Sequence, residues 1–216
     1  MTAHGTVRRM TDGQKSDIIA TITGVIPSDL SFDEAQTIIG AKGPFVAEIR
    51  EVFKRRRIQS GLLELIGTIV IPATSMPFVV REKFVVGNAQ AKISWLGENF
   101  TTWFLEKIEE PVVETTLRYA KLITSSVDGP ILTELGDEKA ETTLTQIFAL
   151  IERQAKGEEG VLLTNGWANI FYIRDVNGEL RAVRVGWGGG DWGVDAGSVE
   201  DPDGWGGGRR VFSRNS

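Results

Sequence analysis

An Asn-Gly pair at residues 177–178 lies between two runs in which apolar and polar residues alternate, 168–174 and 180–187. A period of two is the pattern of a strand that buries one face. Asn-Gly is also the dipeptide that most readily supplies the positive backbone angles of a tight turn. The sequence therefore predicts an antiparallel β-hairpin at this point of the chain.

Glycine dominates the segment that follows this hairpin. Ten glycines lie between residues 186 and 208, and the string Gly-Trp-Gly-Gly-Gly occurs twice, at 186–190 and 204–208. Two copies at this spacing match one strand-turn-strand repeat of a meander. We therefore expect residues 160–216 to form an antiparallel β-meander.

The first 60 residues show helical rather than strand spacing. Apolar residues recur every three or four positions, and Ser31 with Glu34 forms a candidate capping box, as does Thr11 with Gln14. Glycine and proline separate the periodic stretches. Residues 1–60 are therefore predicted to form a cluster of three short helices, over 11–26, 31–40 and 44–57.

The remainder of the chain mixes both patterns. β-Branched and aromatic runs predict strands, at 66–71, 78–86, 91–96 and 112–123. Helical spacing predicts a helix over 100–110 and one long helix that Asp137 caps and that ends before Gly157. The expected fold class is α+β, with a helical region at 1–60 and an α+β domain at 61–216.

Composition excludes several kinds of chemistry. The 216 residues contain no cysteine and a single histidine, His4. Thiol catalysis, disulfide frameworks, thiolate metal sites and histidine-dependent triads are therefore excluded or very unfavourable. We expect no cofactor, no metal site and no membrane span, and we expect a cytoplasmic location.

Tryptophans beside the clustered glycines are the leading candidates for a binding site. An indole on a glycine-rich sheet can form a flat platform on which a ligand stacks. The same indole can instead fill the space that glycines leave in a core. The binding hypothesis takes three tryptophans as anchors and two arginines as the polar rim, namely Trp187, Trp192, Trp205, Arg209 and Arg210. It predicts a non-enzymatic protein that engages a protein partner or a small ligand.

A glycine string in the helical region offers an alternative function. Residues 38–43 read Ile-Ile-Gly-Ala-Lys-Gly and are followed by Val46 and Ile49. This string resembles the core of K-homology domains, whose Gly-x-x-Gly loop lets the backbone approach single-stranded nucleic acid. The resemblance implies that Gly40 and Gly43 frame a loop in which Lys42 contacts a phosphate. The structural alternative is a connection in which Gly40 ends one helix and Pro44 begins the next.

A basic run supports the same alternative function. Four consecutive cations end the third predicted helix, Lys54, Arg55, Arg56 and Arg57. They could follow phosphates, or they could complement the helix dipole and remain solvated. Residues 1–60 carry nine basic and seven acidic side chains, whereas the rest carries 15 and 22. Any polyanion is therefore expected to bind the first part of the chain, and nucleic acid ranks behind a protein or small ligand as the partner.

Carboxylates allow a weaker third hypothesis, a carboxylate-dependent hydrolase. Its candidate acids are Glu106, Glu110, Asp191 and Asp195. A raised carboxyl pKa in a cleft would support it. The Asp-x-Asp-Gly string at 201–204 matches only part of a calcium loop, so we interpret it as turn residues.

The chain also resembles a family of bacterial proteins whose Trp- and Gly-rich tails end in Arg-Val-Phe-Ser-Arg-Asn-Ser, as residues 210–216 do here. The resemblance implies no activity, because none is assigned to that family. The functional hypotheses therefore rest on the residues themselves.

Overall fold

The computed structural model describes residues 11–24, 26, 28–40, 43–44, 46–49, 52 and 61–215. The chain divides into two units, Met1–Gln59 and Ser60–Ser216. The first unit contains helices and the second contains helices with a large mixed sheet. The predicted α+β class is confirmed.

Two helices of the first unit agree with the sequence pattern. They are α1 (Asp12–Gly24) and α2 (Phe32–Gly40). The capping box before α2 is present, because Glu34 N donates to Ser31 Oγ at 3.3 Å and Ser31 N donates to Glu34 Oε2 at 2.9 Å. In the third predicted helix, over 44–57, residues 44, 46–49 and 52 are helical, and so is residue 43 just before it.

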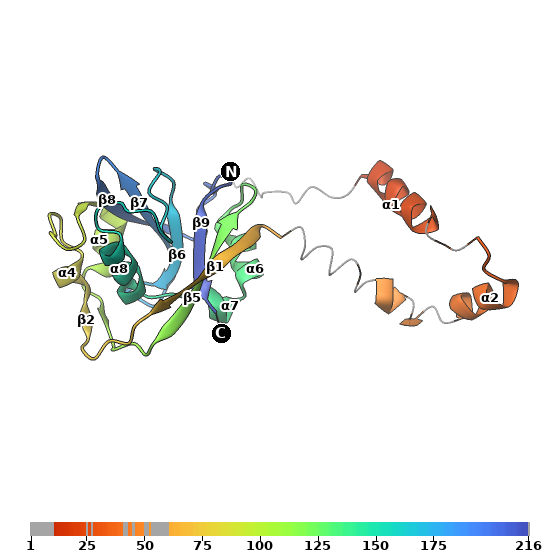
Figure 1. Cartoon of the computed structure of the whole chain (residues 1–216), viewed down its shortest axis with the longest axis horizontal. Coiled ribbons are helices and arrows are strands. Elements are labelled where there is room, and N and C mark those ends of the chain that lie inside the picture. Colours follow the sequence, from red (N-terminus) through yellow and green to blue (C-terminus); the bar gives the residue numbers. More distant parts are fainter. Residues whose placement is uncertain are drawn as a thin grey trace. The chain divides into compact units, whose positions relative to one another are not determined.

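A seven-stranded sheet forms the centre of the second unit (Figure 1). Its strands, in spatial order, are β1 (Leu63–Ile71), β5 (Thr115–Leu122), β9 (Arg210–Arg214), β6 (Asn169–Arg174), β7 (Leu180–Gly188), β8 (Asp191–Ser198) and β3 (Ile93–Leu96). Neighbouring strands are antiparallel except for the parallel pairs β6·β9 and β3·β8. A separate two-stranded sheet pairs β2 (Phe78–Val79) with β4 (Ile108–Glu109).

The predicted hairpin is present as β6 and β7, although its turn is wider than the Asn-Gly pair suggests. Arg174 pairs with Leu180, and the Asp175 carboxylate accepts the backbone N–H groups of Asn177 and Glu179 at 2.8 and 3.0 Å. Gly178 has a φ of 81°, in the left-handed region. Asn177 does not share this conformation, because Lys92 is the only non-glycine residue with a positive φ among those described. An Asp-centred turn therefore closes the hairpin, and only the glycine adopts the left-handed conformation.

The meander ends earlier than the glycine repeat predicts. Strands β6, β7 and β8 form it, and the second Gly-Trp-Gly-Gly-Gly copy lies in the connection between β8 and β9. That connection returns the chain to the middle of the sheet, where β9 inserts between β5 and β6. The interpretation of the two copies as one strand-turn-strand repeat was therefore wrong.

Five short helices complete the second unit. They are α4 (Val80–Lys83), α5 (Glu98–Phe104), α6 (Asp128–Leu135), α7 (Asp137–Ala140) and α8 (Leu144–Arg153). The predicted strand over 78–86 is limited to β2, because the chain turns into α4 at Val80. Helix α6 was not predicted.

The predicted long helix is divided into α7 and α8. Thr142 donates its N–H and its hydroxyl to the Tyr172 carbonyl at 2.8 and 3.2 Å, which holds this part of the chain extended beside β6. Thr143, and not Asp137, caps α8 through a capping box with Gln146. Contact with a distant strand therefore overrides the continuous helical pattern.

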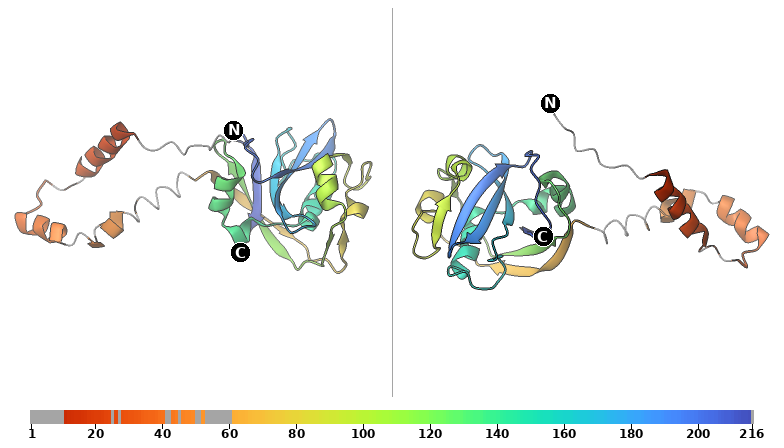
Figure 2. Two further views of the ribbon diagram at one scale, coloured as in Figure 1. Left: turned by 180° about the vertical axis from the view of Figure 1, so that it is seen from behind. Right: turned by 90° about the horizontal axis from the view of Figure 1, so that it is seen from above.

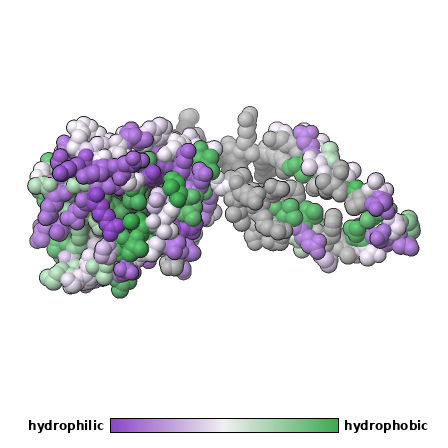
Figure 3. All heavy atoms as spheres, in the orientation of Figure 1, coloured by the Kyte–Doolittle hydropathy of each residue, from purple (hydrophilic) through white to green (hydrophobic). Residues whose placement is uncertain are grey.

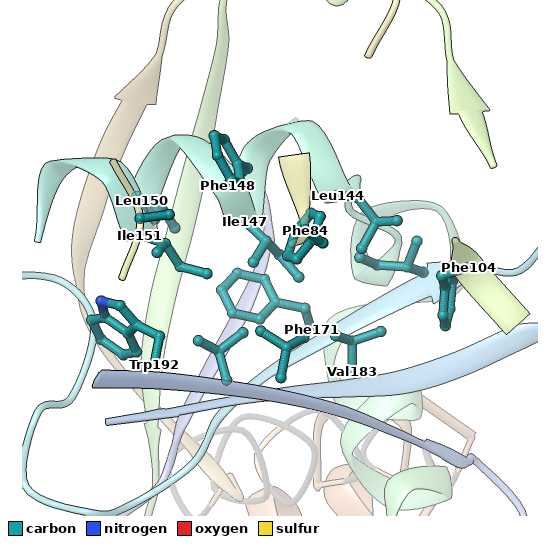
Figure 4. Packing of buried hydrophobic residues seen from close by; sticks show 14 of the residues in the cluster. Phe84, Phe104, Leu144, Ile147, Phe148, Leu150, Ile151, Phe171, Val183 and Trp192 are labelled. Atoms are coloured by element: carbon teal, nitrogen blue, oxygen red, sulfur yellow. The ribbon is translucent and has the colours of Figure 1, made fainter. Parts of the chain in front are cut away.

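Helices cover the two faces of the sheet unequally (Figures 1 and 2). Helix α8 packs on one face, where Figure 4 shows Ile147 and Ile151 pointing toward Phe171, Val183 and Trp192. Helices α6 and α7 pack on the other face, against residues of β5, β6, β7 and β9. On that second face, β8 presents partly exposed residues that alternate with the buried Trp192, Val194 and Ala196.

The exterior of the second unit is largely hydrophilic on the side drawn in Figure 3, with hydrophobic residues gathered in a limited area. Among the described helices, none has both the length and the apolar character that a bilayer crossing requires.

Candidate functional site

A groove lies on the second face of the sheet, over β7, β8 and β3. It consists of two adjoining hollows of about 490 and about 360 Å³. Both hollows are bordered by the same four residues, Arg184, Asp195, Trp205 and Arg209. We call the two hollows together the outer groove. Its volume lies in the range of small-molecule sites.

Glycines form the floor of the first hollow. Gly186 of β7 and Gly193 of β8 lie directly opposite each other, and both border the hollow. Trp95 of β3 pairs with Gly193, and its Cε3 lies 3.2 Å from the position that a Cβ on Gly193 would take. Trp95 is 51% exposed. The sheet therefore offers a half-exposed indole that lies over Gly193, beside open space at Gly186.

Trp205 is fixed at the border between the two hollows. Its backbone pairs with Ser126 through hydrogen bonds of 2.7 and 3.0 Å. Its indole Nε1 donates to Asp128 Oδ1 at 2.7 Å, and the Tyr172 hydroxyl donates to the same oxygen at 2.6 Å. Three elements, α6, β6 and the β8–β9 connection, therefore meet at one carboxylate.

Asp128 is the first residue of α6 and borders the second hollow. It is 2% exposed. Burial raises the pKa of Asp128 above its ordinary value, and the hydrogen bonds from Tyr172 and Trp205 offset part of that effect. The same contacts raise the pKa of Tyr172, because burial and the neighbouring carboxylate both disfavour a phenolate.

Arg209 contributes a guanidinium between two indoles. Its Cζ lies 5.2 Å from the Trp167 ring and 6.0 Å from the Trp205 ring. Its Nε is buried and has no hydrogen-bond partner among the described residues. The second glycine string permits this arrangement: a Cβ on Gly206 would contact Arg209 Nη1, and one on Gly207 would lie 2.8 Å from the Ile123 carbonyl oxygen.

Arg184 and Asp195 form an ion pair across β7 and β8. The Asp195 carboxylate lies so close to Gly97 that a Cβ there would overlap it. The charged groups that border the first hollow are the guanidiniums of Arg184 and Arg209 and the carboxylates of Asp191 and Asp195. The two signs of charge are therefore balanced in this hollow.

The predicted anchors are only partly brought together. Trp205 and Arg209 border both hollows, and Trp187 borders the first. The Trp187 ring, however, packs edge-on against Trp192 with centroids 5.1 Å apart and lies over Gly157. It faces the core side of the sheet, together with the residues around α8.

Two predicted binding residues lie outside the groove. Trp192 is 0% exposed and donates its indole N–H to the Gln154 carbonyl at 3.1 Å. Arg210 donates to the carbonyls of Gly160 and Val161 and stacks at 5.5 Å on Tyr119, and burial lowers its pKa. Trp192 is therefore a core residue and Arg210 a structural contact. Neither residue borders the outer groove, and strand periodicity could not indicate this because it does not tell which face of the sheet is covered.

The candidate acids of the hydrolase hypothesis are also dispersed. Asp191 and Asp195 border the groove, whereas Glu106 forms an exposed ion pair with Arg81. Glu110 does not border either hollow. Asp128 is the carboxyl in a hollow with a raised pKa, and it was not among the candidates.

The nucleic-acid hypothesis falls largely outside the described residues. Gly40 is the last residue of α2 and Gly43 is helical. Lys42 and the basic run Lys54, Arg55, Arg56 and Arg57 are not among the described residues. This alternative stays a prediction.

Three residues of the groove were missed by sequence reasoning: Trp95, Arg184 and Asp128. Trp95 reaches the groove through the parallel pairing of β3 with β8, which joins segments about 100 residues apart. The alternation of β7 could have indicated Arg184, because Arg184 and Gly186 lie on the face opposite to Val183 and Val185. Nothing local distinguishes Asp128 from an ordinary helix-starting aspartate.

Within the described ranges, no group of three or more His, Asp or Glu side chains is arranged to hold a metal ion. Comparisons with protein-family models, curated proteins and solved structures give no match.

Proposed function

We propose that the protein is a binding protein that takes its ligand in the outer groove. The observation that carries the proposal is the exposed Trp95 indole beside the Gly186–Gly193 floor, with Trp205 and Arg209 at the far border. Aromatic rings in a hollow with a few fixed polar groups are typical of ligand sites. A protein or small-molecule partner and a cytoplasmic location stay predictions of the sequence.

A ligand is expected because glycines in strands beside an exposed indole are unfavourable for the stability of the free protein. A glycine in a strand contributes no packing and loses more conformational entropy than other residues. Gly186 has open space where a side chain could stand, and the neighbouring indole remains half exposed. A ligand that stacks on Trp95 and fills this space would restore the burial that the glycines leave out.

Intrinsic tryptophan fluorescence tests the proposal. We expect that one ligand class among oligosaccharides, oligonucleotides and peptides shields tryptophan from acrylamide in the wild-type protein. This shielding should be lost in Trp95→Ala. Val113→Ala is the matched control, because Val113 is 78% exposed and does not border either hollow. Shielding that persists in Trp95→Ala, or the absence of shielding by every class, would contradict the proposal.

A further inference from the structure

The charge of the first hollow narrows the choice of ligand. Arg184 and Asp195 form an ion pair with each other, and the Arg209 Cζ lies 5.2 Å from the Trp167 ring and 6.0 Å from the Trp205 ring. A cationic peptide would meet the Arg209 guanidinium, and a phosphate chain would meet the carboxylates of Asp191 and Asp195. The balance of charge in the first hollow therefore favours an uncharged group there. The second hollow adds the carboxyl groups of Asp128, Asp201 and Asp203, which hydroxyl donors of the same ligand could contact.

The polar groups of the groove require a ligand that both donates and accepts hydrogen bonds. Guanidinium groups only donate and ionised carboxylates only accept, and both kinds border the same hollow. A polyproline segment offers carbonyl acceptors alone and would give no donor to the Asp191 carboxylate, since Asp195 already pairs with Arg184. An extended peptide usually pairs with a free sheet edge. The edge strand here is β3, whereas the open floor lies on β7 and β8, which are each paired on both sides. Hydroxyl groups satisfy both kinds of partner at once.

The shape of the groove agrees with a chain of sugar rings. A pyranose has an apolar C–H face that can lie on an indole, and hydroxyls around its rim. Trp95 provides the indole over the glycine floor, and the second hollow continues the groove beyond Trp205 toward Asp128. We infer that the outer groove binds a neutral oligosaccharide, with one sugar ring stacked on Trp95 and the chain extending past Trp205. This inference rests on the proposed function.

Titration of the full chain with cellohexaose and chitohexaose, followed by tryptophan fluorescence, tests the inference. Gly186→Val is the decisive variant, because no atom lies within 4 Å of a Cβ at that position and valine favours strands. The added side chain should fill the floor and weaken binding by about tenfold or more, which is the loss expected when one aromatic stacking contact is removed. Gly129→Ala is the control: it also has open space, but it lies in α6 and does not border the groove.

The outcomes separate the two claims. Saturable oligosaccharide binding that Gly186→Val weakens and Gly129→Ala leaves unchanged supports the inference, provided both variants unfold at the wild-type temperature or above. Binding of a basic peptide or an oligothymidylate that depends on Trp95, with no response to either hexasaccharide, overturns the oligosaccharide inference and leaves the proposed function standing. If no ligand class depends on Trp95, the proposed function fails as well.

Discussion

A single carboxyl group, Asp128, connects the groove to the core. Its Oδ1 already accepts from both Tyr172 and Trp205, and an indole N–H can only donate. The proton of the neutral acid therefore belongs on Oδ2. Asp128 fixes the position of the Trp205 ring, which a ligand would contact, and it is the group through which pH would act on the groove.

The raised pKa of Asp128 predicts how stability depends on pH. In the interval between the ordinary value of 3.8 and the raised folded value, the folded protein binds more protons than the unfolded chain does. Stability from this group is thus complete below the ordinary value and decreases as pH rises through the folded pKa. Asp128→Asn cannot ionise, so we expect the variant to gain stability relative to wild type as pH increases across this interval.

Urea denaturation of both proteins at a series of pH values measures this difference. Asp128→Asn preserves an acceptor for Trp205, so lost packing is a small part of the effect. If the unfolding free energies of wild type and Asp128→Asn differ by a constant amount across the pH series, Asp128 has the same pKa in the folded and the unfolded protein. The folded-state pKa would then lie at its ordinary value.

Residue type alone could not show which tryptophans lie in the core and which border the groove. Trp187, Trp192 and Trp205 all lie in the glycine-rich part of the sequence. Trp192 is a core residue, Trp187 packs its ring on the core side and borders only the first hollow, and Trp205 borders both hollows. The difference arises from the strand face and from Gly157, whose missing side chain gives the Trp187 ring its place. Neither can be read from local composition.

At the scale of elements, the buried carboxylate of Glu109 takes the place of water as the hydrogen-bond acceptor at the start of α8. Glu109 of β4 accepts the N–H groups of Leu144 and Thr145 at 2.9 and 2.8 Å, and the Thr145 hydroxyl at 2.6 Å. Helix N-termini favour a negative charge because their first N–H groups lack partners. Glu109 therefore joins the small sheet to the main helix of the core.

Glu109→Gln tests this junction. The amide N–H₂ would face helix N–H groups, leaving a buried donor unsatisfied, so we expect a loss of about 2 kcal/mol in unfolding free energy. Glu110→Gln is the matched control, because Glu110 is exposed, and it should change stability by less than about 0.5 kcal/mol. Equal stabilities for the two variants in chemical denaturation would contradict the role given to Glu109.

Local patterns predicted some elements well and others poorly. The hairpin, the strand at 112–123 and the box at Ser31 depend on neighbouring residues, and all are present. Helix α8 begins late because Thr142 is bonded to β6, and β9 leaves the meander to pair with β5 and β6. These departures result from pairings between distant segments, and another pairing of that kind, between β3 and β8, brings Trp95 to the groove.

At the scale of the whole molecule, the oligosaccharide and nucleic-acid hypotheses predict different responses of affinity to ionic strength. The net charge is −5, and residues 1–60 carry the basic excess. Phosphate binding releases counterions and weakens steeply with salt. A neutral ligand held by stacking and by hydrogen bonds releases none, so its affinity should not follow the salt concentration.

We therefore expect the dissociation constant for cellohexaose to change by less than about twofold when the salt concentration increases from about 0.05 to 0.5 M. The Debye length shortens severalfold over this interval. Any binding of oligothymidylate by the full chain should weaken at least about tenfold over the same interval. It should also be unaffected by Gly186→Val, since its basic residues belong to the first unit. Isothermal titration at both salt concentrations measures the two ligands in parallel. An oligosaccharide affinity that falls with salt as steeply as that for oligothymidylate would contradict recognition by stacking and hydrogen bonds in the charge-balanced first hollow.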